Sequence, residues 1–421
     1  MSTVATGSGC DVVIAGGGLV GLSLARALAN TPLRLCLVES MPAPAASAPD
    51  HDNRNTALSP SSRHIFSALG CWQGIAAGAA PITEIHVSDQ GGFGRVCMRA
   101  DDEGMDALGH VVPNHLLGQV LAEAVSGQRN LEIRQPADVA AIQDAGDHIS
   151  LSVREADTTR LVHARLVVVA DGSRSSLRER LGIAVTETDY GQTGIIANVT
   201  PEQSPQGRAF ERFTARGPLA MLPLPGGQCS LVWTVRSPES ERLLGLSDQA
   251  FLDELQQAFG FRLGRLLRAG RRSAWPLRLL RSRERRRGRA LVIGNAARTL
   301  HPVAGQGFNL ALRDVAELAE RLHDAAVIGD DPGAEHVMAR FLAARKADDR
   351  RVINFTDGLV RLFSNRLPGV VLGRNLGLMA VDLFPAGRRW FMRQAMGRGA
   401  RPSRLARGLP LADPRDARTS E

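Results

Sequence analysis

The pattern of apolar and polar positions predicts a strand, a loop, a helix and a second strand at the start of the chain. A β-branched run at 12–15 leads into a glycine loop, and a helical pattern continues to about Asn30. The next apolar run, 33–38, ends at Glu39. This order is typical of a parallel α/β sheet, in which the loop after the first strand receives a ligand.

Further apolar runs extend this pattern over the first half of the chain. Ser59 is in position to cap a helix at 60–69, and Gly91-Gly92 forms the turn of a strand pair at 82–96. Another helix is expected at 114–125, and strands at 131–133, 149–153 and 161–170.

From residue 191 the pattern changes to short strands separated by proline and glycine turns, which indicates an antiparallel sheet. These strands are expected at 194–199, 209–213, 219–222 and 229–235. The basic segment 281–289 then leads to an apolar strand at 290–293, and the rest of the chain is largely helical, with a loosely held tail from Gly397.

We therefore expect an α/β fold with a Rossmann-like parallel-sheet domain interwoven with a smaller antiparallel-sheet domain, because 421 residues exceed one average domain. The first domain would take residues 1–80, 110–185 and 285–365. The second would take 81–109 and 186–284, and a helical, basic C-terminal region would take 366–421.

The net charge of +8 comes almost entirely from arginine, since Lys346 is the only lysine. This excess reflects either a composition bias or attraction to an anionic surface. Nucleic acid is not expected as a partner, because the chain has a single tyrosine, four tryptophans and no zinc-finger or helix-turn-helix spacing.

The cysteines are scattered and odd in number, and no CxxC pair occurs, so we expect reduced thiols, no metal site and a cytoplasmic protein. They are Cys10, Cys36, Cys71, Cys97 and Cys229. No signal peptide is visible, and no apolar run of 18 residues is present, so no membrane-spanning helix is expected.

The first glycine loop, Gly16-x-Gly18-x-x-Gly21, lies between the first strand and its helix, with Glu39 eighteen residues beyond it. Such glycines allow a tight turn and the close approach of a pyrophosphate to the helix N-terminus, while the acid accepts hydrogen bonds from a ribose. The carboxylate favours FAD or NAD over NADP. An accidental glycine-rich turn is the alternative.

A second motif, Asp171-Gly172-x-x-Ser175-x-x-Arg178, follows a buried strand. Taken alone, it is equally well explained as a plain strand-to-helix turn capped by the aspartate. Arg54 follows a polar loop and, taken alone, is explained as a solvated arginine.

A third segment, 294–314, lies between the strand at 290–293 and a helical pattern at 310–322. Its loop contains Pro302, Gly305 and Gly307. Backbone N–H groups in such a loop can approach an anionic ligand closely. Two glycine loops this far apart in sequence indicate one long cofactor held by both ends of the chain.

Taken together, these segments resemble the class A flavoprotein monooxygenases, the para-hydroxybenzoate hydroxylase family, over nearly the whole chain. That family shows GxGxxG with a distal acid, DGxxSxxR, and a late GDxxHxxxPxxGQGxNxxxxD. Here Asn295 replaces the aspartate of the late motif and Arg298 its histidine, and Asn114 stands where many members have arginine. The resemblance implies an FAD-binding domain, a substrate domain, NADPH or NADH as electron donor, and O2 as co-substrate.

The resemblance also implies the roles of individual residues. Pro302 would lie against the flavin beside the oxygen site, and His301 is a candidate base by position, with packing against the loop as the alternative. The residues expected to bind FAD are Gly16, Gly18, Gly21, Glu39, Arg54, Asp171, Gly172, Asn295, Gly305, Gln306, Gly307 and Asn309.

Within this family, the finer resemblance is to the hydroxylases of ubiquinone biosynthesis. It rests on Arg54-x-x-Ala57-Leu58, on 294–302, on 304–310, and on the run Phe-Glu-Arg-Phe-Thr at 210–214. It implies hydroxylation of 2-polyprenyl-6-methoxyphenol to the 1,4-benzoquinol. Alternatives are another ring hydroxylation of the same pathway, a flavoenzyme of different chemistry such as a reductase, or a flavin-binding subunit with weak activity of its own.

A polyprenyl phenol carries a long apolar tail, so the resemblance also implies contact with a membrane. The helical segment 367–384 is either an internal packing face or a membrane face, and basic residues follow it. They are Arg388, Arg389, Arg393, Arg398 and Arg401. We expect peripheral contact with the inner membrane, and other proteins of the pathway are candidate partners.

Overall fold

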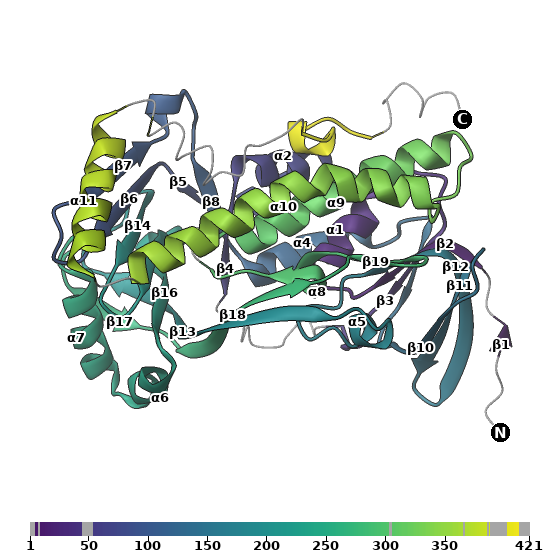
Figure 1. The fold of residues 1–421 in the computed structure, drawn as a ribbon, viewed down its shortest axis with the longest axis horizontal. Coiled ribbons are helices and arrows are strands. Elements are labelled where there is room, and N and C mark those ends of the chain that lie inside the picture. The colour runs from purple at the N-terminus through teal and green to yellow at the C-terminus, as the bar shows by residue number, and fades with distance from the viewer. Residues whose placement is uncertain are drawn as a thin grey trace.

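Two large β-sheets and several long helices make up the molecule (Figure 1). The computed structural model describes residues 5–6, 9–43, 54–302, 305–364, 367–384, 387 and 402–411. The mixed α/β architecture expected from the sequence is confirmed.

The first large sheet has a parallel centre. Its strands lie in the order β20 (Ala290–Val292), β12 (Thr158–Val169), β2 (Cys10–Ala15), β3 (Leu35–Val38) and β9 (Leu131–Arg134). Along the N-terminal part of β12, the strands β10 (Asp138–Asp144) and β11 (Ile149–Glu155) add an antiparallel extension. The short strands β1 (Ala5–Thr6) and β19 (Arg286–Arg287) pair with β12 and β20.

Both faces of the parallel centre are buried, which explains its continuous apolar runs. Val12 and Ile14 belong to one core cluster, whereas Val13 and Ala15 belong to another on the opposite face. Helices cover the first face: α1 (Leu19–Ala27), α2 (Pro60–Ala68), α3 (Trp72–Ala76), α4 (Asn114–Val125), α9 (Gln306–Val327) and α10 (Glu335–Ser364). The second face packs against β10, β11 and α5 (Ser176–Arg180).

The second large sheet contains β21 (Arg298–Thr299), β18 (Ser273–Ser282), β13 (Val185–Pro201), β16 (Cys229–Arg236), β15 (Pro218–Pro223), β14 (Arg208–Phe213), β6 (Glu84–Asp89) and β7 (Arg95–Arg99), in this order. A further strand, β17 (Leu266–Ala269), pairs with β13. The helices α6 (Ser237–Gly245) and α7 (Asp248–Phe259) cover one face, around the fully buried Trp233.

One feature of the second sheet corrects the sequence analysis. β14 and β6 are parallel, whereas the other neighbouring strands of this sheet are antiparallel. The two strands come from segments more than one hundred residues apart, so no hairpin sets their direction, and the local pattern at 209–213 does not encode it.

A small third sheet lies against the second. It contains β4 (Asn55–Leu58), β8 (Gly109–Pro113) and β5 (Ala80–Ile82). Ile82 and Val111 share a core cluster with Val87 and Phe213 of the second sheet. The Asn55 amide nitrogen donates hydrogen bonds to the side-chain oxygens of Asn198 and Ser230, both at 3.0 Å, so β4 is tied to the face of the large sheet.

The C-terminal region returns to both ends of the molecule. α11 (Pro368–Leu383) packs against β7, and residues 402–411, with the short helix η4 (Leu405–Arg407), pack against α2 and α9. The loosely held tail expected from 397 is therefore wrong for 402–411, where Leu405 is buried and Arg404 pairs with Glu320. Within the described ranges, we find no helix with both the length and the apolar character needed to cross a bilayer.

Candidate cofactor and substrate site

The carboxyl ends of four parallel strands meet at one edge of the first sheet. Ala15 is in register with Val38 and Val169, and Val169 is in register with Val292. The loops that follow these strands contain the first glycine motif, Glu39, the Asp171-Gly172 motif and the late motif. The structure thus brings together three segments that are far apart in sequence, at the edge where open α/β sheets bind ligands.

The first glycine loop is too tight for other residues. Gly16 has φ +112°, and a Cβ there would lie 2.6 Å from the carbonyl oxygen of Ala170, while a Cβ at Gly21 would collide with the carbonyl oxygen of Gly16. Gly18 differs, because a Cβ on it would meet nothing within 4 Å. Since Gly18 is the N-cap of α1, this open space lies at a helix N-terminus, where a pyrophosphate is favoured.

Glu39 lies directly beside this loop. Its Oε2 accepts a hydrogen bond from the Gly17 N–H at 2.6 Å, and its Oε1 accepts one from the Met41 N–H at 2.7 Å. These bonds fix the carboxylate at the end of β3. The Ser40 hydroxyl also donates to Oε1, whereas Oε2 keeps a further lone pair that a ribose hydroxyl could use.

Asp171 provides a buried oxygen that lacks a partner. Its Oδ2 accepts from the Leu177 N–H at 3.3 Å, whereas Oδ1 is buried and, among the described residues, receives no hydrogen bond. Burial raises the pKa of this carboxyl. Next to it, Gly172 has φ +91° and open space around its Cβ position. A ligand hydroxyl at this place would satisfy the oxygen.

Arg178 holds the second motif against the third. Ser175 caps α5 by accepting a hydrogen bond from the Arg178 N–H at 3.0 Å. The buried guanidinium then donates to the carbonyl oxygens of Ser173 at 3.3 Å and Ala296 at 3.0 Å. The last residue of DGxxSxxR therefore has a structural role here, because it joins the loop of the second motif to that of the late motif.

The late motif begins on the short helix α8 (Gly294–Ala297). Gly294 has φ +61°, and a Cβ there would lie 3.2 Å from the side chain of Val20 in α1, so this turn packs closely on the first motif. Asn295 is exposed at the same edge. Gly305, with φ +59°, caps α9, and its Cβ would lie 3.3 Å from the Cβ of Ala57. Gln306 is buried, and Gly307 has open space at its Cβ position.

Asn309 holds the start of α9 against β4 and α2. Its Oδ1 accepts from the Ser59 N–H at 2.8 Å and the Ser62 hydroxyl at 2.7 Å. Its Nδ2 donates to the carbonyl oxygens of Ala57 at 2.8 Å and Gly305 at 2.7 Å. The amide has no capacity left for a ligand, so any effect of Asn309 on a cofactor acts through the position of the loop.

His301 and Pro302 have contrasting environments. His301 is 2 % exposed, and the ring of Tyr190 lies edge-on to it with 5.4 Å between ring centroids. Burial lowers the pKa of His301 to about 4, so the imidazole is neutral at neutral pH. Pro302 is exposed, and its carbonyl oxygen accepts from the Gly305 N–H at 2.9 Å.

Arg54 directly precedes β4, and Asn114 directly follows its neighbouring strand β8. The Arg54 guanidinium is 5.4 Å from the ring centroid of Trp275, and its carbonyl oxygen accepts from the Asn114 N–H. The Asn114 side chain accepts from the Thr56 hydroxyl at 2.6 Å. A contact between Arg54 and FAD stays a prediction.

A cavity of about 470 Å³ lies beside these loops, which is within the usual size of a small-molecule site. The second sheet, α10 and α11 supply its walls, including Tyr190, Thr214, Phe363 and Arg374. Tyr190 also contacts His301, so it connects this cavity with the late motif. Sequence reasoning missed Tyr190, because only the fold brings residue 190 next to residue 301.

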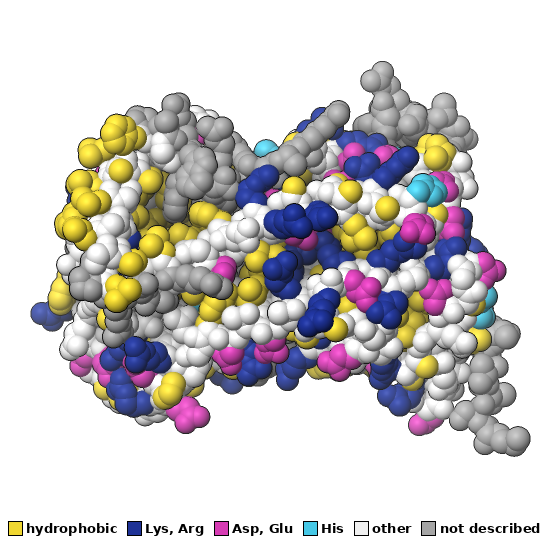
Figure 2. All heavy atoms as spheres, viewed as in Figure 1, with side chains coloured by type: hydrophobic (Ala, Val, Ile, Leu, Met, Phe, Trp, Pro, Cys, Tyr) yellow, Lys and Arg dark blue, Asp and Glu magenta, His cyan; other side chains and the backbone are white. Residues whose placement is uncertain are grey.

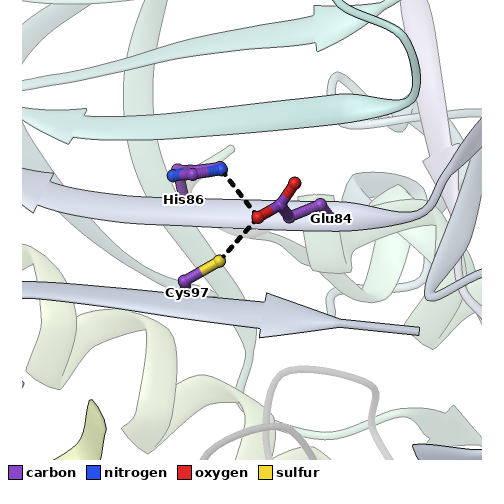
Figure 3. A group of neighbouring side chains, drawn as sticks. All are labelled: Glu84, His86 and Cys97. Atoms are coloured by element: carbon purple, nitrogen blue, oxygen red, sulfur yellow. Dashed lines mark hydrogen bonds and ion pairs between the residues drawn. The ribbon is translucent and has the colours of Figure 1, made fainter. Parts of the chain in front are cut away.

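Another polar cluster lies on β6 and β7, away from these loops (Figure 3). Glu84 Oε1 accepts from the Cys97 thiol at 2.8 Å and lies 3.1 Å from His86 Nε2. Burial, together with the Glu84 carboxylate, raises the pKa of the Cys97 thiol to about 11, and Arg99 also pairs with Glu84. A protonated thiol is a poor metal ligand, and the nearby Arg99 guanidinium repels a cation. The three side chains are therefore explained by their hydrogen bonds, without a bound metal ion.

Comparison with known proteins gives consistent matches. Residues 9–354 match the family model described as FAD binding domain. The ubiquinone hydroxylase UbiL of Rhodospirillum rubrum is 40% identical over 404 residues, which cover 95% of this chain and 93% of that protein. The 3-demethoxyubiquinol 3-hydroxylase of Escherichia coli is 30% identical over 390 residues, covering 92% and 98% of the two chains.

Solved structures agree on the fold. The p-nitrophenol 4-monooxygenase PnpA of Pseudomonas putida superposes with a TM-score of 0.77 at 19% identity, over 95% of this chain and all of that one. PqsL of Pseudomonas aeruginosa, described as a probable FAD-dependent monooxygenase, gives a TM-score of 0.73 at 22% identity, over 89% of this chain and 100% of that one. At such identities the similarity supports the architecture alone.

Proposed function

The chain belongs to the FAD binding domain family and is an FAD-dependent oxidoreductase, and from this premise we propose that it hydroxylates a prenylated phenol in ubiquinone biosynthesis. The substrate that we favour is 2-polyprenyl-6-methoxyphenol, converted to the 1,4-benzoquinol. One observation carries the proposal: the three cofactor motifs converge, and Tyr190 connects their last loop to a cavity of suitable size. The names of the full-length relatives support the same pathway.

The residues at the sheet edge fit FAD. Open space at Gly18 and Gly172, the unpartnered Asp171 oxygen and the fixed carboxylate of Glu39 suit an extended dinucleotide with hydroxyl and diphosphate groups. When bound, FAD supplies the activation of O2 with two electrons from NADPH or NADH. The protein has to hold the flavin and the substrate in position and to exclude water.

The late motif would act on the flavin through its backbone. The 22-residue helix α9 starts at Gln306, so its positive end points toward the loop that contains Pro302 and Gly305. A helix N-terminus stabilises negative charge on a reduced flavin ring. Pro302, which has no N–H and is exposed on this loop, would lie against the ring.

The cavity would receive the substrate. Phe363 lines it and stacks on Phe213, so an aromatic ring would meet apolar surface, while Thr214 and Arg374 offer polar groups. The relative named as a 3-demethoxyubiquinol 3-hydroxylase supports a second candidate, in which another carbon of the ring is hydroxylated.

We also propose peripheral contact with a membrane through α11. Its two charged residues turn inward, since Arg374 pairs with Asp89 at 2.7 Å and Asp382 accepts from the Cys97 N–H at 3.0 Å. The outward face is apolar, and Figure 2 shows such side chains gathered over α11. The large exposed residues of this face are Leu367, Leu372, Leu376, Met379, Leu383 and Phe384.

A lipid surface suits this face, because the same helix lines the cavity with Val371 and Arg374 and a prenyl tail dissolves in lipid. Internal packing, the other role expected for this helix from the sequence, applies to its opposite face, where Leu378 is buried. The basic residues expected to support this contact, Arg388, Arg389, Arg393, Arg398 and Arg401, lie outside the described residues.

The test of the reaction is direct. The purified protein should show a bound-FAD spectrum and should oxidise NADH or NADPH faster when a short-chain 2-prenyl-6-methoxyphenol is added, with mass spectrometry detecting a product heavier by one oxygen. In parallel, a deletion strain should accumulate the 6-methoxyphenol intermediate. Accumulation of a different ring intermediate would move the protein to another step, and an FAD spectrum without any hydroxylated product would overturn the proposed reaction.

A further inference from the structure

We propose that the carboxylate of Glu211 accepts the proton of the substrate's phenolic hydroxyl. This inference rests on the phenol hydroxylation proposed above, and it assigns a catalytic role to a residue of the Phe-Glu-Arg-Phe-Thr run at 210–214. That run served above only as a mark of resemblance.

Glu211 faces the side of the second sheet that looks toward the third sheet. Residues two apart on a strand share a face, so Glu211 lies on the same side as Ala209 and Phe213. Both of these belong to the core cluster that contains Val111 of the third sheet. The opposite face of β14 carries Phe210, which packs into the core beneath α6 and α7.

The immediate neighbours of Glu211 are apolar. On β6 it is in register with Val87, and on β15 with Ala220, which in turn is in register with Val232 of β16. Asp89 is the charged residue of β6 on this face, and Arg374 neutralises it at 2.7 Å. The carboxyl of Glu211 is half-buried, and no side chain or backbone group of the described structure bonds to it.

This setting makes Glu211 unusual among the acids of the molecule, many of which pair with arginines. Burial alone raises the pKa of its carboxyl to about 7, so the group is divided between its two protonation states near neutral pH. A general base is most effective when its pKa lies near the working pH. A half-buried, unpaired acid of this kind indicates a functional site rather than a structural ion pair.

The same face is connected to the cofactor loops through β4. Ala57 of β4 packs against the cluster shared by Ala209 and Phe213, and the Cβ position of Gly305 lies 3.3 Å from the Ala57 Cβ. Asn55, two residues before Ala57 on β4, donates a hydrogen bond to Ser230 of β16 in the large sheet. Ala57 therefore contacts both the cluster on the Glu211 face and the loop of the late motif.

The step is a proton transfer. The phenolic O–H bond breaks, its proton passes to a carboxylate oxygen of Glu211, and the electron pair stays on the substrate oxygen. Delocalisation of that pair makes the ring carbons ortho and para to it more nucleophilic toward the oxygen that the flavin activates. The carboxyl then gives the proton back to the product oxygen or to water. His301 suits this role less well, because a base with a pKa of about 4 holds a proton poorly at neutral pH.

The first test compares Glu211→Gln, which keeps shape and removes the charge, with Glu211→Asp and with Glu123→Gln on the exposed face of α4. With a short-chain prenylated phenol, Glu211→Gln should keep the FAD spectrum and a KM near wild type, while kcat falls at least about 100-fold. Wild-type kcat/KM should rise with pH through about 7, and Glu211→Gln should lose that rise. Glu211→Asp should keep part of the activity, and Glu123→Gln all of it.

A second readout needs no turnover. A prenylated nitrophenol is yellow as phenolate, so its absorbance in the complex reports whether the protein has taken the proton. Wild type should bind more of the yellow form below neutral pH than Glu211→Gln does. Equal ionisation in both proteins, or an unchanged pH profile of kcat/KM, would overturn the role of Glu211. If wild type ionises the probe without hydroxylating the phenol, the proposed reaction fails while the role of Glu211 as proton acceptor stands.

Discussion

The guanidinium of Arg298 lies 2.9 Å from the fully buried carboxylate of Asp314, and this pair joins β21 to the first half of α9. Arg285 and Arg345 contact the same carboxylate at 2.9 and 2.7 Å. Arg298 stands where the resemblance places a histidine. Here the arginine belongs to a cluster of ion pairs with Asp314 of α9 and Asp349 of α10.

Replacement of Asp314 by asparagine should destabilise the protein strongly, because three largely buried guanidinium groups lose the carboxylate that they share and keep only Asp348 or Asp349 as counter-charge. We expect the free energy of unfolding in urea to fall by about 3 kcal/mol or more. As a control, Asp138→Asn removes the carboxylate of an exposed pair with Arg154 and should cost less than about 1 kcal/mol. If both variants lost a similar free energy of unfolding, the buried ion cluster around Asp314 would not stabilise the fold as proposed.

The pH dependence has a definite sign. Burial would raise the pKa of Asp314, but Arg285, Arg298 and Arg345 together lower it below its ordinary value. The stabilisation is therefore present above the ordinary pKa of an aspartate, about 3.9, and is lost as the pH falls below it. Asp314→Asn should lose this part of the acid sensitivity.

Replacement of Arg178 by methionine should weaken FAD binding without touching the cofactor directly. The variant loses the hydrogen bonds to Ser173 and Ala296 that hold together two of the loops proposed to bind FAD. We expect the FAD dissociation constant, measured by quenching of flavin fluorescence, to rise at least about tenfold, because a tenfold change corresponds to about 1.4 kcal/mol and the loss of one such bond can cost that much. Arg174→Met, at an exposed position in the same loop, should leave it unchanged.

The two glycines of the first loop should respond differently to alanine. Gly21→Ala places a methyl group against the Gly16 carbonyl oxygen, so both stability and FAD binding should fall, stability by about 2 kcal/mol. The new methyl group of Gly18→Ala meets no atom of the described residues within 4 Å, so thermal unfolding of the apoprotein should be unchanged while FAD binds at least about tenfold more weakly. Normal FAD affinity in Gly18→Ala would place the pyrophosphate elsewhere.

His301 should make the protein less stable in mild acid. Its pKa of about 4 in the folded state lies below the ordinary 6.5, so the unfolded chain takes up the proton first. The cost is absent above about pH 6.5, grows as the pH falls toward 4, and reaches about 2 kcal/mol at pH 5. In His301→Gln, the difference in unfolding free energy between pH 7 and pH 5 should shrink by that amount, and an unchanged difference would mean that the histidine titrates normally.

The outward face of α11 can be tested by flotation with anionic vesicles at low salt. Wild type should float with the vesicles, and the double variant Leu372→Glu and Leu376→Glu should not, because two carboxylates on this face oppose burial in lipid. Val327→Glu changes an exposed apolar residue at the end of α9 and should float like wild type. If the double variant still floated with the vesicles, the outward face of α11 would not be the membrane contact.

Local sequence patterns were sufficient to predict the helices and strands next to the three motifs. Ser59 caps α2 as predicted, and α4 covers 114–125. The first strand–loop–helix unit is also confirmed, because consecutive residues determine alternation, capping and tight glycine turns. Sequence reasoning missed β18 and the helices α6 and α7, although the buried positions of α7 (251, 252, 255, 258 and 259) follow a helical period.

The sequence by itself determined the family, the cofactor and the loops that should hold it, since glycine at a tight turn and an acid after a strand have local physical causes. The tertiary structure decided which of these groups still have free bonding capacity. Asn309, a candidate ligand from its motif, uses its whole amide on protein atoms, whereas Asp171 keeps a buried oxygen that no described residue bonds. It also brought Tyr190 to His301 and buried Glu211 among apolar neighbours, because burial and long-range contacts depend on strands that pair across more than one hundred residues.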